Sequence, residues 1–228
     1  MYNICCLLFK DSKRSQKFNK VNCPYDQNWV ITLYNMVSRN ITKPFNFFCL
    51  TDQHIENQNI NQIMLQTDKP STYDKLYFFK EGVLPNLPTI YFDLDVVIIN
   101  NIEKLFEYSG LRMVHKLARD FEAGHYAPHN GSVIKWQPSK VHKLYERYAA
   151  TPKEDLPGTD DDFLYLNGAP HPFSVKDCVC YTAQRDNLLW WDKPYKLNKE
   201  NTVVCFNKHA SKQDVFQEES PWIKDYWY

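Results

Sequence analysis

The sequence predicts an α/β domain, because segments typical of strands alternate with segments typical of helices along its whole length. The chain has 228 residues, which is room for one domain, and it contains neither an internal repeat nor a low-complexity linker. Hydrophobic residues make up 43% of it and aromatic residues 15%, enough to build a packed core and to exclude a wholly disordered chain. One compact domain with two unequal halves is the expected organisation.

The first half of the chain is expected to contain a long helix, a short helix and several strands. Apolar side chains recur at helical spacing over residues 29–37, and Pro44 ends that segment. A shorter helical segment around Leu76 and Phe79 ends at Gly82. The predicted strands, which are rich in apolar residues, are 3–9, 45–50, 62–66 and 89–99.

The second half is expected to continue the alternation. A helix over residues 141–148 presents apolar and aromatic side chains on one face, and a loop at 151–159 separates it from a helical segment at 160–167. An aromatic segment, PWIKDYWY, lies at 221–228. The predicted strands are 111–116, 131–136, 174–181 and 202–207.

The charge balance argues against a protein built to bind nucleic acid. Lysine and arginine together number 27, aspartate and glutamate also number 27, and the formal net charge is zero. No apolar run is long enough to cross a bilayer, in agreement with a mean hydropathy of −0.56. The short apolar run near the N-terminus has no basic residue before it and no small-residue cleavage site after it, so we expect a strand there rather than a signal peptide.

The cysteines favour a reducing compartment. Their number, seven, is odd, no CxxC pair occurs, and most of them lie in apolar or strand-like surroundings, where a thiol behaves as a small hydrophobe. Reduced thiols in a cytoplasmic protein are therefore expected. A zinc site from Cys178 and Cys180 is the alternative, although their spacing differs from that of zinc ribbons and fingers.

The most informative segment is TIYFDLDVVII at 89–99, where two aspartates interrupt an apolar run. In a strand, Asp93 and Asp95 point to one side and Leu94 to the other. Two carboxylates about 5 Å apart repel by roughly 3 kcal/mol at an effective dielectric near 20, and desolvation adds to that cost. Either one is protonated or a divalent cation lies between them, held also by substrate phosphates. The alternative is a strand end whose aspartates cap loops and face water.

An ordered set of motifs around this pair resembles the GT-A-fold glycosyltransferases, nearest to the group of glycogenin and the bacterial lipopolysaccharide galactosyltransferases, with their small bacterial and viral relatives. The resemblance runs from residue 3 to the C-terminus. It implies a single GT-A (Rossmann-like) domain over 1–228, with a mixed central sheet flanked by helices. Residues 1–106 would form the nucleotide-binding half, and 107–228 the acceptor half and C-terminal tail. The motifs are YDKLYFF, TIYFDLDVVI, NGSVIKW, TDDDFL, VVCFNK and PWIKDYW.

The resemblance implies a metal-dependent hexosyltransferase. Its donor would be a nucleotide-diphosphate sugar, with a UDP-hexose expected, and its acceptor a glycan or another hydroxyl, with retention at the anomeric carbon. Asp93 would bind Mn²⁺ (or Mg²⁺) and the ribose, and Asp95 the metal alone. The family's third metal ligand is a histidine in a late strand, where the simplest alignment places Cys205 or Asn207. His209 is the chemically attractive ligand but comes late, and a thiolate suits manganese poorly.

The donor-binding and catalytic residues follow from the same resemblance. Lys75 matches a lysine that reaches the donor, although it could equally be an ordinary helix-surface lysine. Asn130 matches an asparagine that holds the donor sugar, but the order here is Asn-Gly-Ser, and an Asn-Gly turn before a strand is the alternative. Asp160 matches an acidic residue near the donor sugar and acceptor, while Asp161 stands where glutamine is usual. Aspartates also suit the start of a helix, which is the structural alternative.

Further donor contacts are expected on weaker grounds. Tyr25 and Asn28 resemble positions near the nucleotide, and Lys208 and Lys212 could meet the diphosphate electrostatically. We take Asp160 and Asn130 as the catalytic residues.

Two other functions fit part of the pattern. Haloacid-dehalogenase-type phosphatases also use an apolar strand ending in DxD with a later acidic cluster, and Asp93 would then be a nucleophile. In those enzymes, however, the DxD follows the first strand, whereas three predicted strands precede it here. A non-catalytic nucleotide-sugar or carbohydrate-binding protein on the same scaffold is the other alternative, motivated by the missing histidine.

Overall fold

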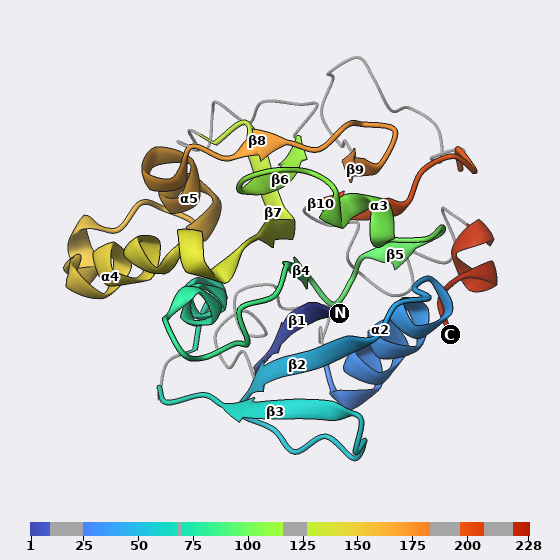
Figure 1. Cartoon of the computed structure of the whole chain (residues 1–228), viewed down its shortest axis with the longest axis horizontal. Coiled ribbons are helices and arrows are strands. Elements are labelled where there is room, and N and C mark those ends of the chain that lie inside the picture. The colour runs from blue at the N-terminus through green and yellow to red at the C-terminus, as the bar shows by residue number, and fades with distance from the viewer. Residues whose placement is uncertain (10–24, 68–69, 116–126, 183–196, 208–220) are drawn as a thin grey trace, which may run out of the picture.

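The computed structural model of the chain describes residues 1–9, 25–67, 70–115, 127–182, 197–207 and 221–228 (Figure 1). Within these residues a seven-stranded mixed sheet forms the centre of the molecule. Its first four strands are parallel, β7 runs antiparallel to both of its neighbours, and β8 pairs parallel to β6. The strands, in spatial order, are β3 (Ile60–Met64), β2 (Phe45–Thr51), β1 (Tyr2–Leu8), β4 (Thr89–Phe92), β7 (His129–Trp136), β6 (Arg112–His115) and β8 (His171–Pro172).

A second, three-stranded sheet lies beside the first. β5 (Val97–Ile98) pairs antiparallel with β10 (Val203–Asn207), and β10 pairs parallel with β9 (Cys178–Thr182). The pairing brings a segment near the C-terminus beside the residues that follow the central acidic pair. Because Val204 stands opposite Val97 in an antiparallel register, the residues after Val204 run toward Asp95.

The helices begin where side chains satisfy free backbone amides. The Asp26 carboxylate accepts from Asn28 N at the start of the longest helix, and the Thr159 hydroxyl accepts from Asp162 N at another helix start. Ser71 and Asp74 form a reciprocal capping box. The α-helices are α2 (Gln27–Arg39), α3 (Glu103–Phe106), α4 (His142–Ala150) and α5 (Asp160–Gly168), and the 3₁₀ helices are η1 (Thr72–Phe79), η3 (Pro138–Lys140), η4 (Lys153–Asp155) and η6 (Pro221–Asp225).

Alternate side chains of β1 enter two separate apolar cores. Ile4 and Leu8 pack in a core with α2, whereas Cys5 and Leu7 pack in a core with η1 and α5. All four are buried. Figure 1 shows α2 on one side of the molecule and α4 and α5 on the other. The sheet is therefore covered on both faces, as expected for strands that are nearly continuously apolar.

The α/β class and the mixed central sheet predicted from the sequence are confirmed. The prediction of one strand over 89–99 is wrong, because β4 ends at Phe92 and the chain turns through 93–95 before β5 joins the other sheet. Asp93 N donates to Ser132 O (2.8 Å), and Val96 N then donates back to Asp93 O (3.4 Å) across the turn. The acidic pair therefore lies on a turn at the end of β4.

Smaller boundary differences have local causes. β3 lies two residues earlier than predicted, since it follows the register of β2, with Phe47 opposite Ile60. The predicted strand 174–181 is reduced to β9, because Asp177 N and Cys178 N both donate to Ser174 O in a turn before it.

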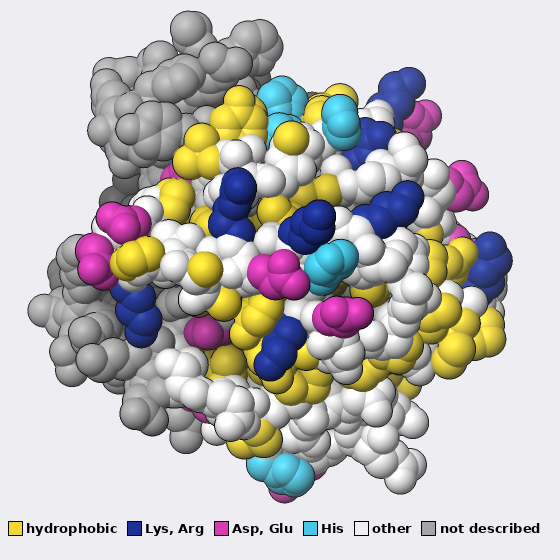
Figure 2. Space-filling model, turned by 60° about the vertical axis from the view of Figure 1, so that its left-hand side comes forward, with side chains coloured by type: hydrophobic (Ala, Val, Ile, Leu, Met, Phe, Trp, Pro, Cys, Tyr) yellow, Lys and Arg dark blue, Asp and Glu magenta, His cyan; other side chains and the backbone are white. Residues whose placement is uncertain are grey.

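None of the helices in the described part of the chain combines the length and the apolar character needed to span a membrane. Figure 2 shows that side chains of both charge signs are interspersed on the face it presents, without a basic stripe. This distribution agrees with the zero net charge of the chain.

Candidate active site

A buried lysine is the centre of the site. Lys75 lies on η1, and 5% of its side chain is exposed. Its Nζ is 2.9 Å from Asp160 Oδ2 and 3.5 Å from Asp93 Oδ1, and it donates to Gly131 O at 3.4 Å. Four segments distant in sequence therefore meet around one ammonium group.

The surrounding carboxylates keep Lys75 charged. Burial by itself lowers the pKa of this ammonium group, but Asp160, Asp93 and Asp161 outweigh burial and raise the pKa well above its ordinary value. Asp160 is itself only 4% exposed, so its partner is this ammonium and not bulk water. Each charge is thus tolerated in the interior because the other is present.

Asp93 is held from one side and open on the other. The Tyr91 hydroxyl donates to Asp93 Oδ1 at 2.7 Å, the same oxygen that Lys75 approaches. Burial, and then the charge of Asp93, raises the pKa of Tyr91, so its phenol remains a donor. About a third of the Asp93 side chain (32%) is exposed, which leaves the carboxylate accessible to a ligand.

Asp95 is the buried member of the acidic pair. It is 7% exposed, and the Tyr25 hydroxyl donates to its Oδ2 at 3.1 Å. Burial, followed by the charge of Asp93, raises the pKa of Asp95 to about 7. The two carboxylates therefore repel each other, as the sequence predicted, although they lie on a turn and not on a strand.

The raised pKa of Asp95 gives the protein a specific pH dependence in metal-free buffer. Between about pH 4 and about pH 7 the folded state holds a proton that the unfolded state has released, so this group's stabilising contribution is complete below about pH 4 and is lost by about pH 7. We expect the free energy of unfolding, measured with urea in EDTA, to fall across this range. Asp95→Asn should flatten the fall, and an equally steep profile in that variant would contradict the assignment.

A glycine and an aspartate fix the segment that carries Asn130. Gly131 N donates to Asp161 Oδ1 at 2.7 Å, and Ser132 N donates to Asn130 Oδ1 at 2.8 Å. Asn130 is 9% exposed. A Cβ placed on Gly131 would lie 2.5 Å from Asp161 Oδ1 and 3.4 Å from Lys75 Nζ, so no side chain fits between the strand and these charged groups.

Gly131→Ala should therefore disturb the site. The methyl group has to displace the Asp161 carboxylate, and we expect the free energy of unfolding to fall by about 1–3 kcal/mol. Gly158→Ala is the matched control, because a Cβ there meets no atom within 4 Å. Urea denaturation of both variants measures the difference. Equal free energies of unfolding would contradict the prediction, because they would mean that the Asp161 side chain can move away from the methyl group at no cost in stability.

The remaining predicted residues are placed less closely or not at all. Asn28 is exposed at the start of α2, and its side chain donates to Asp26 Oδ2 at 3.1 Å, so the structure does not bring it to the acidic pair. Asn207 is the last residue of β10. Lys208, His209 and Lys212 lie outside the described residues.

The Cys205 thiol is near enough to the acidic pair for the charges of both aspartates to affect its pKa. Burial first, then neighbouring thiols including Cys180, and finally the carboxylates of Asp95 and Asp93 raise its pKa. A neutral buried thiol is a poor ligand for a hard cation. The end of β10 nevertheless runs toward the turn at 93–95. A third metal ligand from this part of the chain therefore stays a prediction.

Two carboxylates suit a divalent cation that shares its coordination with phosphates. Oxygen ligands are those preferred by Mg²⁺ and Mn²⁺, and such ions are commonly held by one or two carboxylates together with substrate phosphates. The mutual repulsion that raises the pKa of Asp95 is what a dication between the two groups would relieve. Within the described part of the chain, no three His, Cys, Asp or Glu side chains form a metal-binding group by themselves.

Sequence reasoning missed two members of the site. Tyr91 lies two residues before Asp93, and the period of two along a strand could have indicated that its hydroxyl reaches the same side. The contact between Gly131 and Asp161 has no such signal, because it joins backbone and side chain across 30 residues.

The comparisons with known proteins give structural matches only. No family model matches the sequence, and no curated protein matches it. A crystal structure of the galactosyltransferase LgtC in complex with donor and acceptor sugar analogs is similar with a TM-score of 0.62 at 13% identity, covering 98% of this chain and 94% of that one. An active-site mutant of LgtC gives 0.61 at 14% identity with the same coverage.

A larger protein contains the same architecture. The apo structure of the bifunctional glycosyltransferase WbbM is similar with a TM-score of 0.59 at 11% identity, covering 98% of this chain and 50% of WbbM. The chain thus spans nearly all of LgtC and about half of WbbM. Over nearly its whole length, it has the GT-A fold seen in LgtC and in other solved glycosyltransferases.

Proposed function

We propose that this protein is a metal-dependent glycosyltransferase, which moves a hexose from a nucleoside-diphosphate sugar to a hydroxyl acceptor with retention at the anomeric carbon. The observation that carries the proposal is the meeting of Lys75, Asp93 and Asp160 at the end of β4. The fold adds support, since LgtC has been solved with donor and acceptor sugar analogs.

Asp93 and Asp95 are the proposed metal-binding residues. When bound, Mn²⁺ or Mg²⁺ acts as a Lewis acid that neutralises the negative charge developing on the departing diphosphate. Tyr91 and Tyr25 each donate a hydroxyl hydrogen bond to one of the two carboxylates and so limit its rotation. Loading with metal requires Asp95 to be ionised, and affinity is therefore expected to rise as the pH rises through about 7.

Lys75 is the proposed fixed cation of the donor site. Two carboxylates already hold its ammonium group in place, so the group need not move when a phosphate or sugar oxygen of the donor binds nearby. Such a fixed charge is the basis of electrostatic preorganisation. Asp160 and Asn130 are proposed to orient the donor sugar, with Asp161 and Gly131 holding the backbone of that segment. Asp160 is paired with Lys75, so its role is positional rather than that of a general base.

The test is the release of the nucleotide from a panel of nucleotide sugars. UDP-glucose and UDP-galactose are incubated without acceptor in Mn²⁺ and in EDTA, and free UDP is measured by chromatography. Release that requires metal supports the proposal. Phosphate release from a sugar phosphate without UDP formation would instead indicate a phosphatase, and binding without any turnover would indicate a carbohydrate-binding protein on this scaffold.

A further inference from the structure

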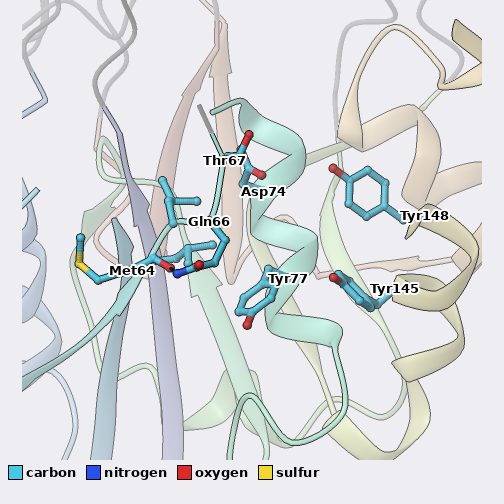
Figure 3. A pocket seen from close by; sticks show the side chains of 9 residues that line it. Met64, Gln66, Thr67, Asp74, Tyr77, Tyr145 and Tyr148 are labelled. Atoms are coloured by element: carbon cyan, nitrogen blue, oxygen red, sulfur yellow. Dashed lines mark hydrogen bonds between the residues drawn. The ribbon is translucent and has the colours of Figure 1, made fainter. Parts of the chain in front are cut away.

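A tyrosine-lined cavity lies on the other side of η1 from Lys75. We call it the tyrosine groove: its volume is about 200 Å³, and Gln66, Thr67, Asp74, Tyr77, Tyr145 and Tyr148 line it. Figure 3 shows Tyr145 and Tyr148 projecting from α4 toward Tyr77 on η1, with Gln66 and Thr67 on the segment that follows β3. The groove therefore lies between α4, η1 and the segment after β3, and its lining residues are not among those of the candidate active site.

Packing among the rings gives the groove a fixed shape. The Tyr77 and Tyr145 rings meet edge to face with centroids 6.0 Å apart, and Tyr145 meets Tyr148 at 6.2 Å. Tyr148 also stacks on Tyr73, with 5.6 Å between centroids and 7° between planes. Such aromatic contacts hold rings in place without closing the space between the elements.

Polar atoms of the three tyrosines, of Asp74 and of Gln66 are available to a ligand. Within the described part of the chain, the hydroxyls of Tyr77, Tyr145 and Tyr148 have no protein hydrogen-bond partner. Asp74 accepts from Ser71 N through Oδ2 (2.6 Å), which leaves Oδ1 as an acceptor, and burial raises the pKa of this carboxyl. Gln66 donates through Nε2 to Met64 O at 3.1 Å, which leaves its amide oxygen.

We propose that the tyrosine groove binds one neutral sugar unit of a glycan. A pyranose presents a face of C–H groups, which packs on aromatic rings whose faces are negative, and an edge of hydroxyls, which pairs with carboxylate, amide and phenol oxygens. Among the described residues that line the groove, Asp74 is the only charged one, and it is an unfavourable neighbour for a phosphate or another anion. The volume suits a single ring, since it falls below the 300–1,000 Å³ of drug-sized sites.

One basic side chain, Lys80, lies near the groove and could attract an anion, so the test includes competition with inorganic phosphate. The ammonium of Lys80 is 5.5 Å from the centroid of the Tyr77 ring and 5.9 Å from that of Tyr145, and this residue is exposed. An anion attracted by Lys80 would be displaced by inorganic phosphate, whereas a neutral sugar would not.

The proposed sugar site is separate from the proposed donor site and needs neither metal nor nucleotide. The two share η1, because Lys75 faces the acidic groups while Asp74 and Tyr77 face the groove. They also share Tyr73, whose ring stacks on Tyr148 and whose hydroxyl donates to Thr159 O at 2.8 Å, next to Asp160. A glycan held in the groove would thus lie near the site of transfer without occupying it.

The test uses saturation-transfer NMR with the full chain in EDTA and no nucleotide. The probes are methyl α-glucoside, methyl β-galactoside, lactose and maltotriose, each at millimolar concentration, since a single sugar unit is expected to bind with a Kd on the order of 1 mM. At least one probe should receive saturation from the protein. Tyr145→Ala should weaken that binding about tenfold or more, whereas Asp93→Ala should leave it unchanged.

Matched variants show whether a substitution weakens sugar binding directly or by unfolding the protein. Tyr165→Ala removes an exposed tyrosine from α5 and should leave binding intact, and Tyr77→Phe with Tyr148→Phe keeps the rings but removes two hydroxyls and should weaken it. The proposal is overturned if no probe binds, if Asp93→Ala abolishes the signal while Tyr145→Ala does not, or if inorganic phosphate displaces the sugar. Because metal and nucleotide are absent, failure here leaves the glycosyltransferase proposal standing.

Discussion

Replacing Lys75 by methionine is expected to lower the free energy of unfolding by about 3–5 kcal/mol at pH 7. Methionine fills a similar volume and removes only the charge, so Asp160 and Asp93 lose the ammonium group that lies 2.9 and 3.5 Å from them. Asp160 is almost fully buried and would then carry an unpaired negative charge in the interior. Urea denaturation at pH 7 measures the loss.

Two further variants show whether the charge or the packing is responsible. Adding Asp160→Asn to the methionine variant removes the uncompensated carboxylate and should recover part of the stability. Lys143→Met, at an exposed position of α4, is the control and should change the free energy of unfolding by less than about 0.5 kcal/mol. If Lys75→Met costs less than about 1 kcal/mol, the ion pairs around this residue do not exist as described.

The second large effect is expected on activity. Asp93→Asn should reduce metal-dependent UDP release by about 100-fold to 1,000-fold, because it removes a charge from the group proposed to hold the dication. The protein should still unfold cooperatively, since a third of the Asp93 side chain is exposed and Asn can still accept from Tyr91. Steady-state rates of UDP release at saturating Mn²⁺ measure the effect.

The control for this change is an aspartate remote from the charged cluster. Asp155 is exposed on η4, and Asp155→Asn removes the same charge without touching Lys75 or the turn at 93–95. Its rate should equal that of the parent protein. A parent-like rate for Asp93→Asn would remove the metal-binding role from the acidic pair.

Local patterns predicted the elements of this fold well but not the breaks between them. β1 and β2 could be recognised because both are mainly apolar runs, and β2 is also bounded by Pro44 and Asp52. The interruption after Phe92 could not, because the sequence on both sides of the aspartates favours strand equally. What ends β4 there is the pairing of β5 with β10, a contact between segments about a hundred residues apart.

The sequence predicted those parts of the site that follow from residue spacing or from the order of the family motifs. The acidic pair and its repulsion follow from the spacing of Asp93 and Asp95, and Asp160 was expected near the donor through the resemblance. The contact between Lys75 and Asp160 could not be foreseen, because it depends on how α5 packs against η1 and β7. The third metal ligand stays a prediction, as the segment after Asn207 lies outside the described residues.

Calorimetric titration with UDP-glucose and UDP-galactose tests the central claim most directly, with parent protein and Asp93→Asn each measured in Mn²⁺, in Mg²⁺ and in EDTA. The account predicts that the parent binds at least one of these donors in the presence of a divalent cation, and that EDTA or the substitution weakens binding at least tenfold. Equal affinity for the donor with and without metal, or no binding of either donor under any condition, would contradict it.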